Sequence, residues 1–336
     1  MERMKMHDPT TQRAVLIVGA GGIAQRHIRG FLKTGRAALG IVEPDEGRRA
    51  ATAQQYGIRK VYKRIEDVEL AAWRAAVICA PANFHVPLAT ACAMGGLPFL
   101  LEKPLAVTMD GVDAMLELAA ARKVAARVAY VRRASQELIE AAARIRAGTI
   151  GAVRLGYVNI SQEFPRSRPD FQRTYYARPE MGGGAILDAA SHVIDLLQWI
   201  MGDVREVAAM YDRLALPGVA VEDTCLISLR FKSGAMAQIN LNQFQKPNTS
   251  WIEFVGLQGN LALDGSLLKI GMDDSGAWKT TDFRGEQTPG DYHEARFRRQ
   301  ADMFLDLLDG KSCHLTTLDE ARANLRVALA AKESYT

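Results

Sequence analysis

The chain has 336 residues, of which 48% are apolar and 24% charged. These fractions are typical of globular proteins and exclude a disordered, collagen-like or coiled-coil chain. The formal net charge is +4 with basic residues scattered along the chain, so nucleic acid is not indicated as a partner. No apolar run reaches the ~18–20 residues of a membrane span. Residues 1–13 lack the apolar middle of a signal peptide, and we expect a flexible tail there, on a cytoplasmic protein without a membrane partner.

The cysteines are spread widely along the chain. Cys79, Cys92, Cys225 and Cys313 form no C-x-x-C pair, so the sequence predicts neither a zinc site nor a disulfide framework. We therefore expect an intracellular protein of mixed α/β type without a metal site.

The first part of the chain, up to about residue 131, alternates short apolar runs with amphipathic stretches. This pattern is typical of βαβ units around a parallel sheet. Thr108 or Asp110 is expected to cap the fourth helix, and Gly95 and Gly96 end the third. The expected strands are 14–18, 38–43, 76–79, 99–101 and 126–130, and the expected helices are 23–34, 45–56, 84–94 and 110–122.

After Arg133 the expected strands become longer, and apolar and polar residues alternate within them. This alternation predicts an antiparallel sheet with one open face, including a hairpin turn at 231–235. The expected strands are 153–161, 224–231, 235–245 and 250–255, and the expected helices are 136–147, 185–201, 294–309 and 318–332. The change of pattern predicts two domains, joined near residue 132.

The first expected strand leads into a G-x-G-x-x-A turn that opens a helix. Gly19 allows the tight turn, Gly21 lets the backbone approach a pyrophosphate, and Ala24 allows close packing of helix on strand. The helix start offers N–H groups and the positive end of its dipole to phosphates. This context favours a dinucleotide site over a purely structural turn. The cofactor-binding residues predicted here are Gly19, Gly21, Gly22, Ile23 and Ala24.

Glu43 ends the second expected strand, near the ~20-residue spacing of a ribose-binding acid. Its carboxylate can accept hydrogen bonds from both ribose hydroxyls and would repel a 2′-phosphate, so NAD is favoured over NADP. A solvated strand-end glutamate is the alternative interpretation. Arg48 and Arg49 follow nearby and could serve a 2′-phosphate, which keeps NADP possible.

A lysine follows the fifth expected strand, in the sequence Glu102-Lys103-Pro104. Ligands of open α/β sheets bind at the carboxyl ends of the strands, where Lys103 lies. Its ammonium group can polarise a hydroxyl or ketone oxygen beside a nicotinamide. The alternative is a solvated lysine without a role.

Asp188 and His192 are four residues apart on the expected helix that follows Gly182, Gly183 and Gly184, and this spacing places both side chains on one face. Histidine is the side chain whose unperturbed pKa of ~6.5 suits proton transfer near neutral pH, so His192 is a candidate base and Asp188 can orient its imidazole. Asp195 is also within reach of His192. A packing histidine and a metal ligand are the alternatives, although no further histidine cluster supports a metal.

These features resemble the Gfo/Idh/MocA family of glucose–fructose oxidoreductases, inositol dehydrogenases and rhizopine-catabolism enzymes. The similarity extends from Val15 to about Ser334. The matching motifs are the dinucleotide turn with its following histidine (19–27, with Ala24 where many members have glycine), the segment 79–85, the Glu-Lys-Pro sequence at 102–104, and the segment 182–195. The family contains dehydrogenases, reductases, a few NAD-dependent glycosidases and catalytically silent regulators.

The resemblance implies an N-terminal Rossmann NAD(P)-binding domain (14–132) and a C-terminal α+β domain (133–336). The second domain would hold an open, mainly antiparallel sheet for substrate binding and oligomerisation, with the C-terminal helices packing back on the first domain. A homodimer or homotetramer would form through that sheet. The residues that the resemblance assigns to catalysis are Lys103, Asp188 and His192, and those that it adds to the cofactor site are Pro81, Asn83, His85, Glu102 and Lys103.

The resulting expectation is an NAD(P)-dependent oxidoreductase that transfers a hydride between nicotinamide and a carbinol or ketone of a sugar, polyol or sugar derivative. His192 would act as general base with Asp188 orienting it, and Lys103 would stabilise the alkoxide. The irregular segment 161–176 is expected to bind substrate. The residues of this segment that could bind a substrate are Arg166, Arg168, Arg173, Tyr175 and Tyr176. The substrate-binding residues that we expect are Arg168, Tyr175, Tyr176, Asp188 and His192. The alternatives are a solvated loop, a non-catalytic NAD-binding sensor, and a glycosidase without net redox.

Overall fold

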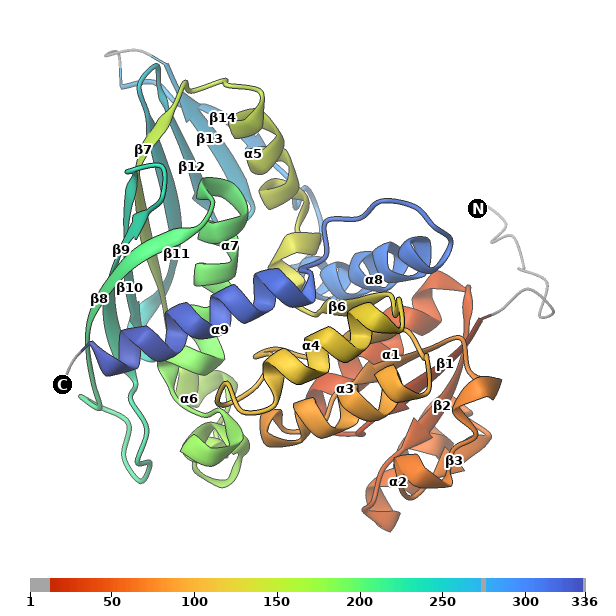
Figure 1. The fold of residues 1–336 in the computed structure, drawn as a ribbon. Helices are drawn as coiled ribbons and strands as arrows, with labels where there is room; N and C mark the ends of the chain where they lie inside the picture. Colours follow the sequence, from red (N-terminus) through yellow and green to blue (C-terminus); the bar gives the residue numbers. More distant parts are fainter. Residues whose placement is uncertain (1–12, 273–275, 335–336) are drawn as a thin grey trace. The chain divides into compact units, whose positions relative to one another are not determined.

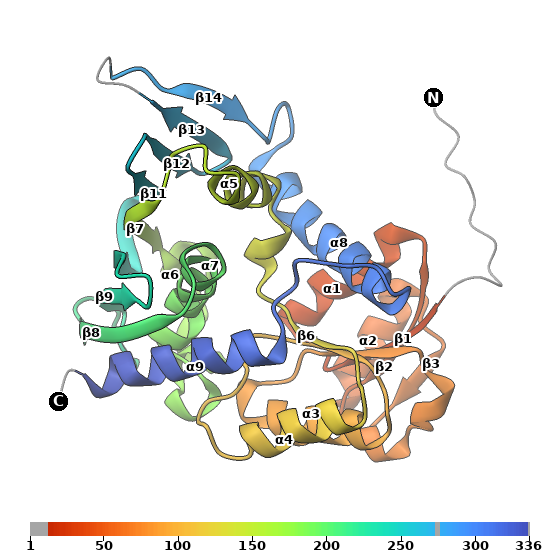
Figure 2. The same ribbon diagram turned by 45° about the horizontal axis from the view of Figure 1, so that its top comes forward.

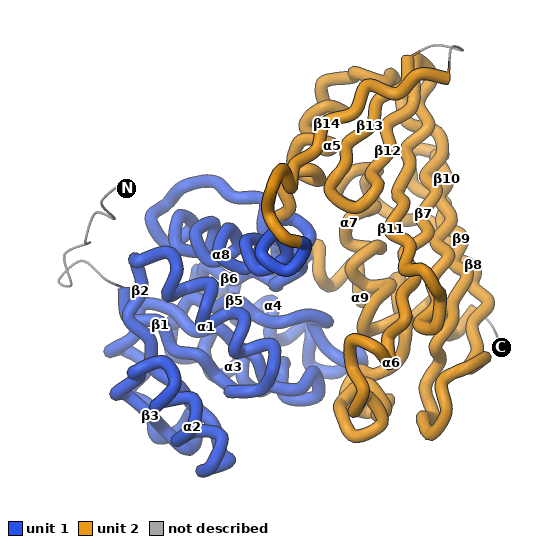
Figure 3. The backbone as a smooth tube through the Cα atoms, turned by 180° about the vertical axis from the view of Figure 1, so that it is seen from behind, with its two compact units in different colours: residues 1–134, 289–319 blue, residues 135–288, 320–336 orange. Residues whose placement is uncertain are grey.

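The computed structural model describes residues 13–272 and 276–334, and its contacts divide the chain into two compact units (Figure 3). Unit 1 comprises residues up to 134 together with 289–319, and unit 2 comprises 135–288 together with residues from 320 onwards. Of the tail expected at 1–13, residues 1–12 lie outside the described residues. Arg13 is the first residue of a strand and pairs with Ala37.

Unit 1 is built on a six-stranded sheet in which every neighbouring pair of strands is parallel. The strands are β1 (Arg13–Val18), β2 (Ala37–Val42), β3 (Lys60–Tyr62), β4 (Ala75–Ile78), β5 (Phe99–Leu101) and β6 (Ala126–Val128). Their order is β3-β2-β1-β4-β5-β6. Strands β2 and β3 are therefore added on one side of β1 and β4 to β6 on the other, so the order of the strands switches between β1 and β4. Ligands of such sheets bind at this switch point, beyond the carboxyl ends of the strands. The predicted Rossmann sheet is confirmed, with β3 as an additional short edge strand.

Helices cover both faces of this sheet (Figure 2). They are α1 (Gly22–Thr34), α2 (Glu46–Tyr56), α3 (His85–Met94), α4 (Val112–Ala121) and α8 (Pro289–Leu308). Figure 2 shows α1 and α8 together on one face and α3 with α4 on the other. The first pair shares a core in which Phe31 packs edge-on against Phe304. The expected cap of α4 is wrong, because α4 starts after Gly111 without a side-chain cap and Thr108 Oγ1 donates to Asp110.

Unit 2 is built on an eight-stranded sheet (Figure 1). The strands are β7 (Val153–Glu163), β8 (Val204–Asp212), β9 (Thr224–Phe231), β10 (Met236–Asn242), β11 (Phe244–Gly256), β12 (Asn260–Asp264), β13 (Leu267–Gly271) and β14 (Lys279–Asp282). Their order is β14-β13-β12-β11-β7-β10-β9-β8. All pairs are antiparallel except β10 with β7. The mainly antiparallel sheet and its hairpin turn at 231–235 were both predicted from the sequence.

The helices of unit 2 are α5 (Gln136–Arg146), α6 (Phe164–Ser167), α7 (Ser191–Met201) and most of α9 (Leu318–Glu333). Helices α5 and α7 cover one face of the sheet (Figure 2). The last turn of α9 lies at the β8 edge, where Tyr211 donates to the carbonyl of Lys332. The strands also carry exposed apolar side chains, which are Tyr157, Met210, Leu226 and Met236. Among the described residues no helix is long and apolar enough to cross a membrane.

Candidate active site

The turn between β1 and α1 has the geometry of a phosphate-binding loop. Gly19 has a φ of +99°, and a Cβ there would lie 2.8 Å from the carbonyl oxygen of Cys79, so only glycine fits where β1 passes the end of β4. At Gly21 and Gly22, by contrast, a Cβ would meet no described atom within 4 Å. The outer side of this turn therefore leaves room for a ligand group against the backbone.

The start of α1 is suited to an anion. Its N-cap, Gly21, provides no side-chain hydrogen bond, and its first turn carries no acidic residue. The N–H groups of a first helical turn have no partner inside the helix, and the dipole places partial positive charge there. A pyrophosphate on the turn would receive these N–H groups, so the residues fit the phosphates of a dinucleotide.

Glu43 follows β2 and is buried, with 3% of its surface exposed. Its Oε2 accepts the Ala20 N–H at 2.8 Å and its Oε1 accepts the Asp45 N–H at 3.0 Å. The carboxylate is therefore fixed against the phosphate-binding turn rather than solvated. Arg48 approaches this carboxylate at 3.5 Å, and Arg49 donates to the Glu43 carbonyl at 2.7 Å.

Lys103 is half-buried and lies directly beyond β5. The preceding residue continues the sheet pairing, because the Glu102 N–H donates to the Ile78 carbonyl at 2.9 Å. Glu102 is buried, with Oε1 2.6 Å from His27 Nε2 and Oε2 accepting the Lys103 N–H at 3.1 Å. Both oxygens of Glu102 are thus engaged within the protein, which favours a supporting role over the expected cofactor contact.

The cofactor-binding residues expected in and after the turn that follows β4 differ in their exposure. Pro81 and Asn83 are exposed at this turn, where a ligand can reach them. His85 is buried, with Nδ1 2.7 Å from the Pro104 carbonyl and Nε2 2.9 Å from the Ala80 carbonyl. Burial lowers the pKa of His85, although its backbone hydrogen bonds and the Glu102 charge act in the opposite direction. His85, like Glu102, supports the turn from inside.

Asp188 and His192 lie on consecutive segments of unit 2 that differ from the expected single α-helix. A π-helical turn spans Ile186–Ala190 and α7 begins at Ser191. The spacing argument from a regular α-helix therefore does not apply, because a π-turn has more residues per turn. Such turns are frequent at functional sites. The side chains of Asp188 and His192 are both partly exposed.

The start of this segment depends on Gly184 and Glu222. Gly184 has a φ of +94°, and a Cβ there would lie 2.6 Å from the Glu222 carboxylate oxygens. That carboxylate accepts the Ile186 N–H at 3.0 Å and pairs with Lys332 at 3.5 Å. Glu222 therefore takes the place of an N-cap, and this distant acid is not recognisable from local sequence. The glycine triplet makes the close approach possible.

The loop of unit 2 that precedes the triple glycine brings one expected substrate residue to Asp188. The Tyr175 hydroxyl donates to Asp188 Oδ1 at 2.8 Å. Arg168 is exposed on the same loop. Tyr176 is buried against Phe164 and Phe171, and burial raises its pKa strongly. This position favours a packing role for Tyr176 over the expected substrate contact.

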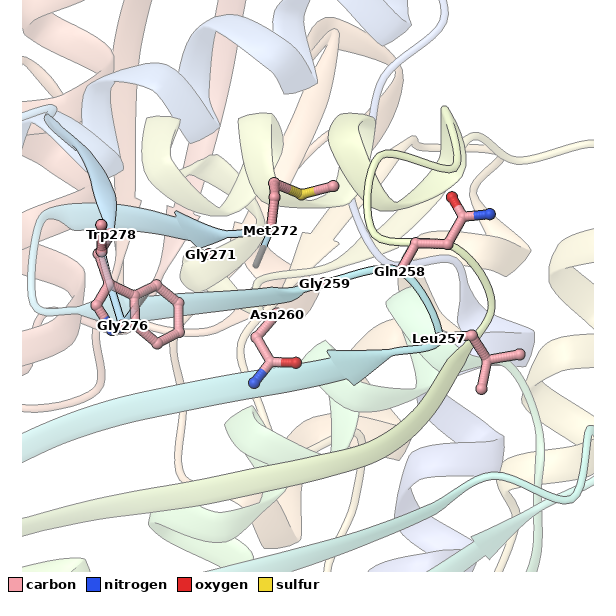
Figure 4. A pocket seen from close by; sticks show the side chains of 9 residues that line it. Leu257, Gln258, Gly259, Asn260, Gly271, Met272, Gly276 and Trp278 are labelled. Atoms are coloured by element: carbon pink, nitrogen blue, oxygen red, sulfur yellow. The ribbon is translucent and has the colours of Figure 1, made fainter. Parts of the chain in front are cut away.

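A separate hollow of about 470 Å³ lies on the sheet of unit 2, at the β11–β12 turn and the end of β13 (Figure 4). Its lining residues are Leu257, Gln258, Gly259, Asn260, Gly271, Met272, Gly276, Ala277 and Trp278. These nine side chains include no acid, base or nucleophile, so we assign no chemistry to this hollow. Across the described part of the chain, no group of three or more His, Cys, Asp and Glu side chains is placed to hold a metal ion.

Two sequence models of one family match most of the chain. The model described as "Oxidoreductase family, NAD-binding Rossmann fold" matches residues 13–130. The model described as "GFO/IDH/MocA C-terminal domain" matches residues 138–262. Together they cover well over half of the chain.

The matches to individual proteins agree with the family models. An uncharacterized oxidoreductase of Synechocystis sp., sll0816, is 28% identical over 248 residues, covering 69% of this chain and 66% of that protein. A myo-inositol 2-dehydrogenase of Thermotoga maritima is 29% identical over 259 residues, covering 74% of each. Among solved structures, the WlbA dehydrogenase of Bordetella pertussis, in complex with NADH and UDP-GlcNAcA, is 26% identical, with a TM-score of 0.80 over 96% of both chains.

Proposed function

The chain belongs to the Gfo/Idh/MocA family of oxidoreductases with an NAD-binding Rossmann fold, and from this premise we propose that it interconverts a carbinol and a ketone on a sugar, polyol or sugar derivative. The observation that carries the proposal is the turn of unit 1. An open glycine turn, an uncapped helix start and the buried acid Glu43 lie at the ends of β1 and β2, and Lys103 follows β5.

Gly21 and Gly22 would hold the pyrophosphate of NAD through their backbone, with Ile23 and Ala24 contributing N–H groups of the first helical turn. Glu43 would receive the ribose hydroxyls in addition to its two backbone donors. The exposed residues Pro81 and Asn83 would contact the nicotinamide half. NAD, when bound, supplies the hydride acceptor.

Side chains of the protein accept the hydroxyl proton and stabilise the charge that develops on the substrate oxygen. Lys103 places its ammonium group at the substrate oxygen and stabilises the negative charge that develops there. His192 removes the hydroxyl proton, and Asp188 orients the imidazole and stabilises its charged form. The Tyr175 hydroxyl donates to Oδ1 of Asp188 and so restrains this carboxylate.

The substrate class follows from the polar side chains of the loop and from the names of relatives. Arg168 offers hydrogen-bond donors to hydroxyl, carboxylate or phosphate groups, and the Tyr175 oxygen, whose proton is donated to Asp188, can accept from a hydroxyl group. The relatives named for myo-inositol and bound to UDP-GlcNAcA act on or bind polyhydroxylated molecules. A polyol or pyranose therefore fits this site best.

We propose that the open face of the unit 2 sheet joins protomers into a homodimer or homotetramer. Support comes from exposed apolar residues at paired positions of the sheet, since Met210 lies opposite Leu226. Apolar side chains gathered on a surface are typical of protein interfaces. A cytoplasmic location accompanies this proposal.

The test of the function is a panel of sugars, polyols and sugar acids, each incubated with the protein and with NAD or NADP. We expect net NADH formation with at least one polyhydroxylated substrate. Substrate cleavage without net NADH would indicate a glycosidase instead. NAD binding without turnover of any compound would indicate a sensor.

A further inference from the structure

Lys103 lies between two residues that are each tied to another element of unit 1. Before it, Glu102 Oε1 lies 2.6 Å from Nε2 of His27 on α1. After it, the Pro104 carbonyl oxygen lies 2.7 Å from Nδ1 of His85 at the start of α3. Both histidines are 1% exposed. The lysine turn is thus held from both sides by buried imidazoles that the proposed chemistry does not use.

The His27–Glu102 pair connects the lysine turn to the phosphate-binding helix. A carboxylate accepts, so His27 donates from Nε2 to one oxygen while the other oxygen accepts the Lys103 N–H. The imidazole packs edge-on against Phe297, with ring centroids 5.4 Å apart and an interplanar angle of 87°. This contact restricts rotation of the ring. Buried hydrogen bonds to a carboxylate are among the strong ones, so the connection is stiff.

The His85 bridge connects the residue after Lys103 to the turn that follows β4. Its Nε2 lies 2.9 Å from the Ala80 carbonyl, and its Nδ1 faces the Pro104 carbonyl. Both carbonyl oxygens accept, so a ring that is protonated on both nitrogens donates to both of them, whereas a neutral ring donates to one and only packs against the other. The bridge therefore spans two turns that both lie at the carboxyl ends of parallel strands, which is the ligand-binding edge of the sheet.

We infer that His27, Glu102 and His85 are positioning residues that hold the Lys103 turn at a fixed place relative to the phosphate-binding turn. This inference rests on the proposed function, in which the Lys103 ammonium group meets the substrate oxygen. The three residues act through the backbone of 102–104. Their effect on rate is large, because a misplacement of about 1 Å in a reacting group can cost on the order of 10²-fold.

The first test removes one acceptor with Glu102→Gln. We expect kcat to fall on the order of 10- to 10²-fold, while the dissociation constant of NAD changes by less than about twofold because the phosphate-binding turn is intact. In a Lys103→Met background the same substitution has no further effect on kcat, because it acts through Lys103. An equal loss in both backgrounds overturns the inference.

A second pair of variants tests the inference independently of whether Glu102→Gln folds. His27→Leu removes the donor to Glu102, whereas His27→Gln keeps an N–H donor at a similar reach and restores most of kcat. The control is Glu294→Gln, which breaks the 3.0 Å contact of Arg29 on the same helix α1 without touching the lysine turn. We expect unchanged kcat in this control. Equal kcat in both His27 variants contradicts the inference.

Hydrogen exchange in the NAD-free protein gives a readout that needs no substrate. Glu102→Gln and His27→Leu should accelerate amide exchange in segment 99–105, and Glu294→Gln should not. Unchanged exchange overturns the inference whatever the reaction is. If the Lys103→Met variant keeps full turnover, the proposed function fails, and accelerated exchange then still supports the positioning of the turn.

Discussion

At the scale of single residues, we assign the proposed cofactor preference to Glu43. The buried carboxylate is anchored by the Ala20 and Asp45 N–H groups, so it stays in place when a ligand arrives. A 2′-phosphate beside it would meet a like charge, which costs binding free energy. Arg48 is exposed and already turned toward this carboxylate. The arrangement favours NAD.

We predict that the protein binds NAD more tightly than NADP and that Glu43→Ala narrows the difference, because the repulsive charge is removed. Calorimetric titration of both variants with both cofactors measures this. Asp45→Ala is a useful control, since it removes a neighbouring carboxylate that accepts the Arg48 N–H at the start of α2 and leaves Glu43 in place. Equal or tighter binding of NADP by the unmodified protein would contradict the prediction.

Lys103→Ala should lower kcat by roughly 10²–10⁴-fold and leave NAD affinity within a small factor. The reason is that Lys103 is assigned to the charge on the substrate oxygen, whereas the phosphate-binding turn is made by backbone groups of β1 and α1. Steady-state kinetics together with NAD titration separates the two effects. A variant with nearly unchanged kcat would show that Lys103 is structural.

Sequence reasoning proposed the residues of the glycine turn and the strand end more readily than their buried support. Gly19 and Glu43 were predicted from motif and spacing, because a tight turn and a strand end require those residue types. His27 was noted only as part of a motif, and Glu102 was assigned to the cofactor. Their pairing joins residues 75 positions apart, and no local pattern encodes such a contact.

At the scale of elements, the packing of α8 on α1 joins a late segment of the chain to the first helix. Arg26 Nη1 lies 2.6 Å from His293 Nε2, and Arg29 pairs with Glu294. Burial, followed by the charges of Arg26 and Arg296, lowers the pKa of His293 to about 4. The neutral imidazole accepts from Arg26 in the folded state.

This shift predicts a loss of stability in mild acid. The folded protein binds fewer protons at His293 than the unfolded chain between the unfolded pKa of ~6.5 and about 4. The contribution of His293 to stability is therefore fully present above the pKa of the unfolded chain and is lost as the pH falls toward the pKa of the folded protein. His293→Gln should make the melting temperature depend less on pH in this window. An unchanged slope would contradict the assignment.

The start of the segment that carries Asp188 depends on Glu222. Glu222→Ala leaves the Ile186 N–H and the Lys332 ammonium group without this partner, and we expect a loss of about 1–3 kcal/mol in the free energy of unfolding. Urea unfolding measures it. Glu206→Ala, at an exposed ion pair on β8, is the matched control and should change stability by less than about 0.5 kcal/mol. Equal effects of both substitutions would contradict the capping role of Glu222.

Most elements were predictable because their patterns are strong. Buried parallel strands such as β1 and β4 are continuous apolar runs, and β9 and β10 alternate around a glycine turn. The π-turn at Ile186–Ala190 was not predicted, because apolar periodicity does not distinguish it from the α-helix that follows. Its start is fixed by Glu222, an acid in the loop between β8 and β9.

At the scale of the whole molecule, the chain consists of a parallel-sheet unit and a mainly antiparallel unit, with residues 289–319 belonging to the first. The change in strand pattern after Arg133 predicted the two sheet types. The strand pattern alone does not predict that α8 joins the first core, because that depends on the match between the apolar sides of α1 and α8; the packing of C-terminal helices on the first domain was expected only from the family resemblance. The sheet of unit 2 retains exposed apolar positions that an assembly would cover.

We predict that Leu226→Lys on β9 shifts the protein from a dimer or tetramer toward the monomer, because a buried lysine without a partner opposes association. Sedimentation at several concentrations measures the change. Val61→Lys, at an exposed apolar residue of β3 in unit 1, is the control and should leave the assembly intact. A monomeric unmodified protein, or equal behaviour of the two variants, would contradict an interface on this sheet.

The most direct measurement of the central claim follows deuterium from substrate to cofactor. A substrate found in the panel is labelled at its carbinol carbon and incubated with the protein and NAD, and the nicotinamide product is analysed by mass spectrometry. Hydride transfer predicts NADH that carries one deuterium, formed by the unmodified protein and reduced on the order of 10²-fold or more in Lys103→Ala. Product formation without deuterium in NADH would contradict the account.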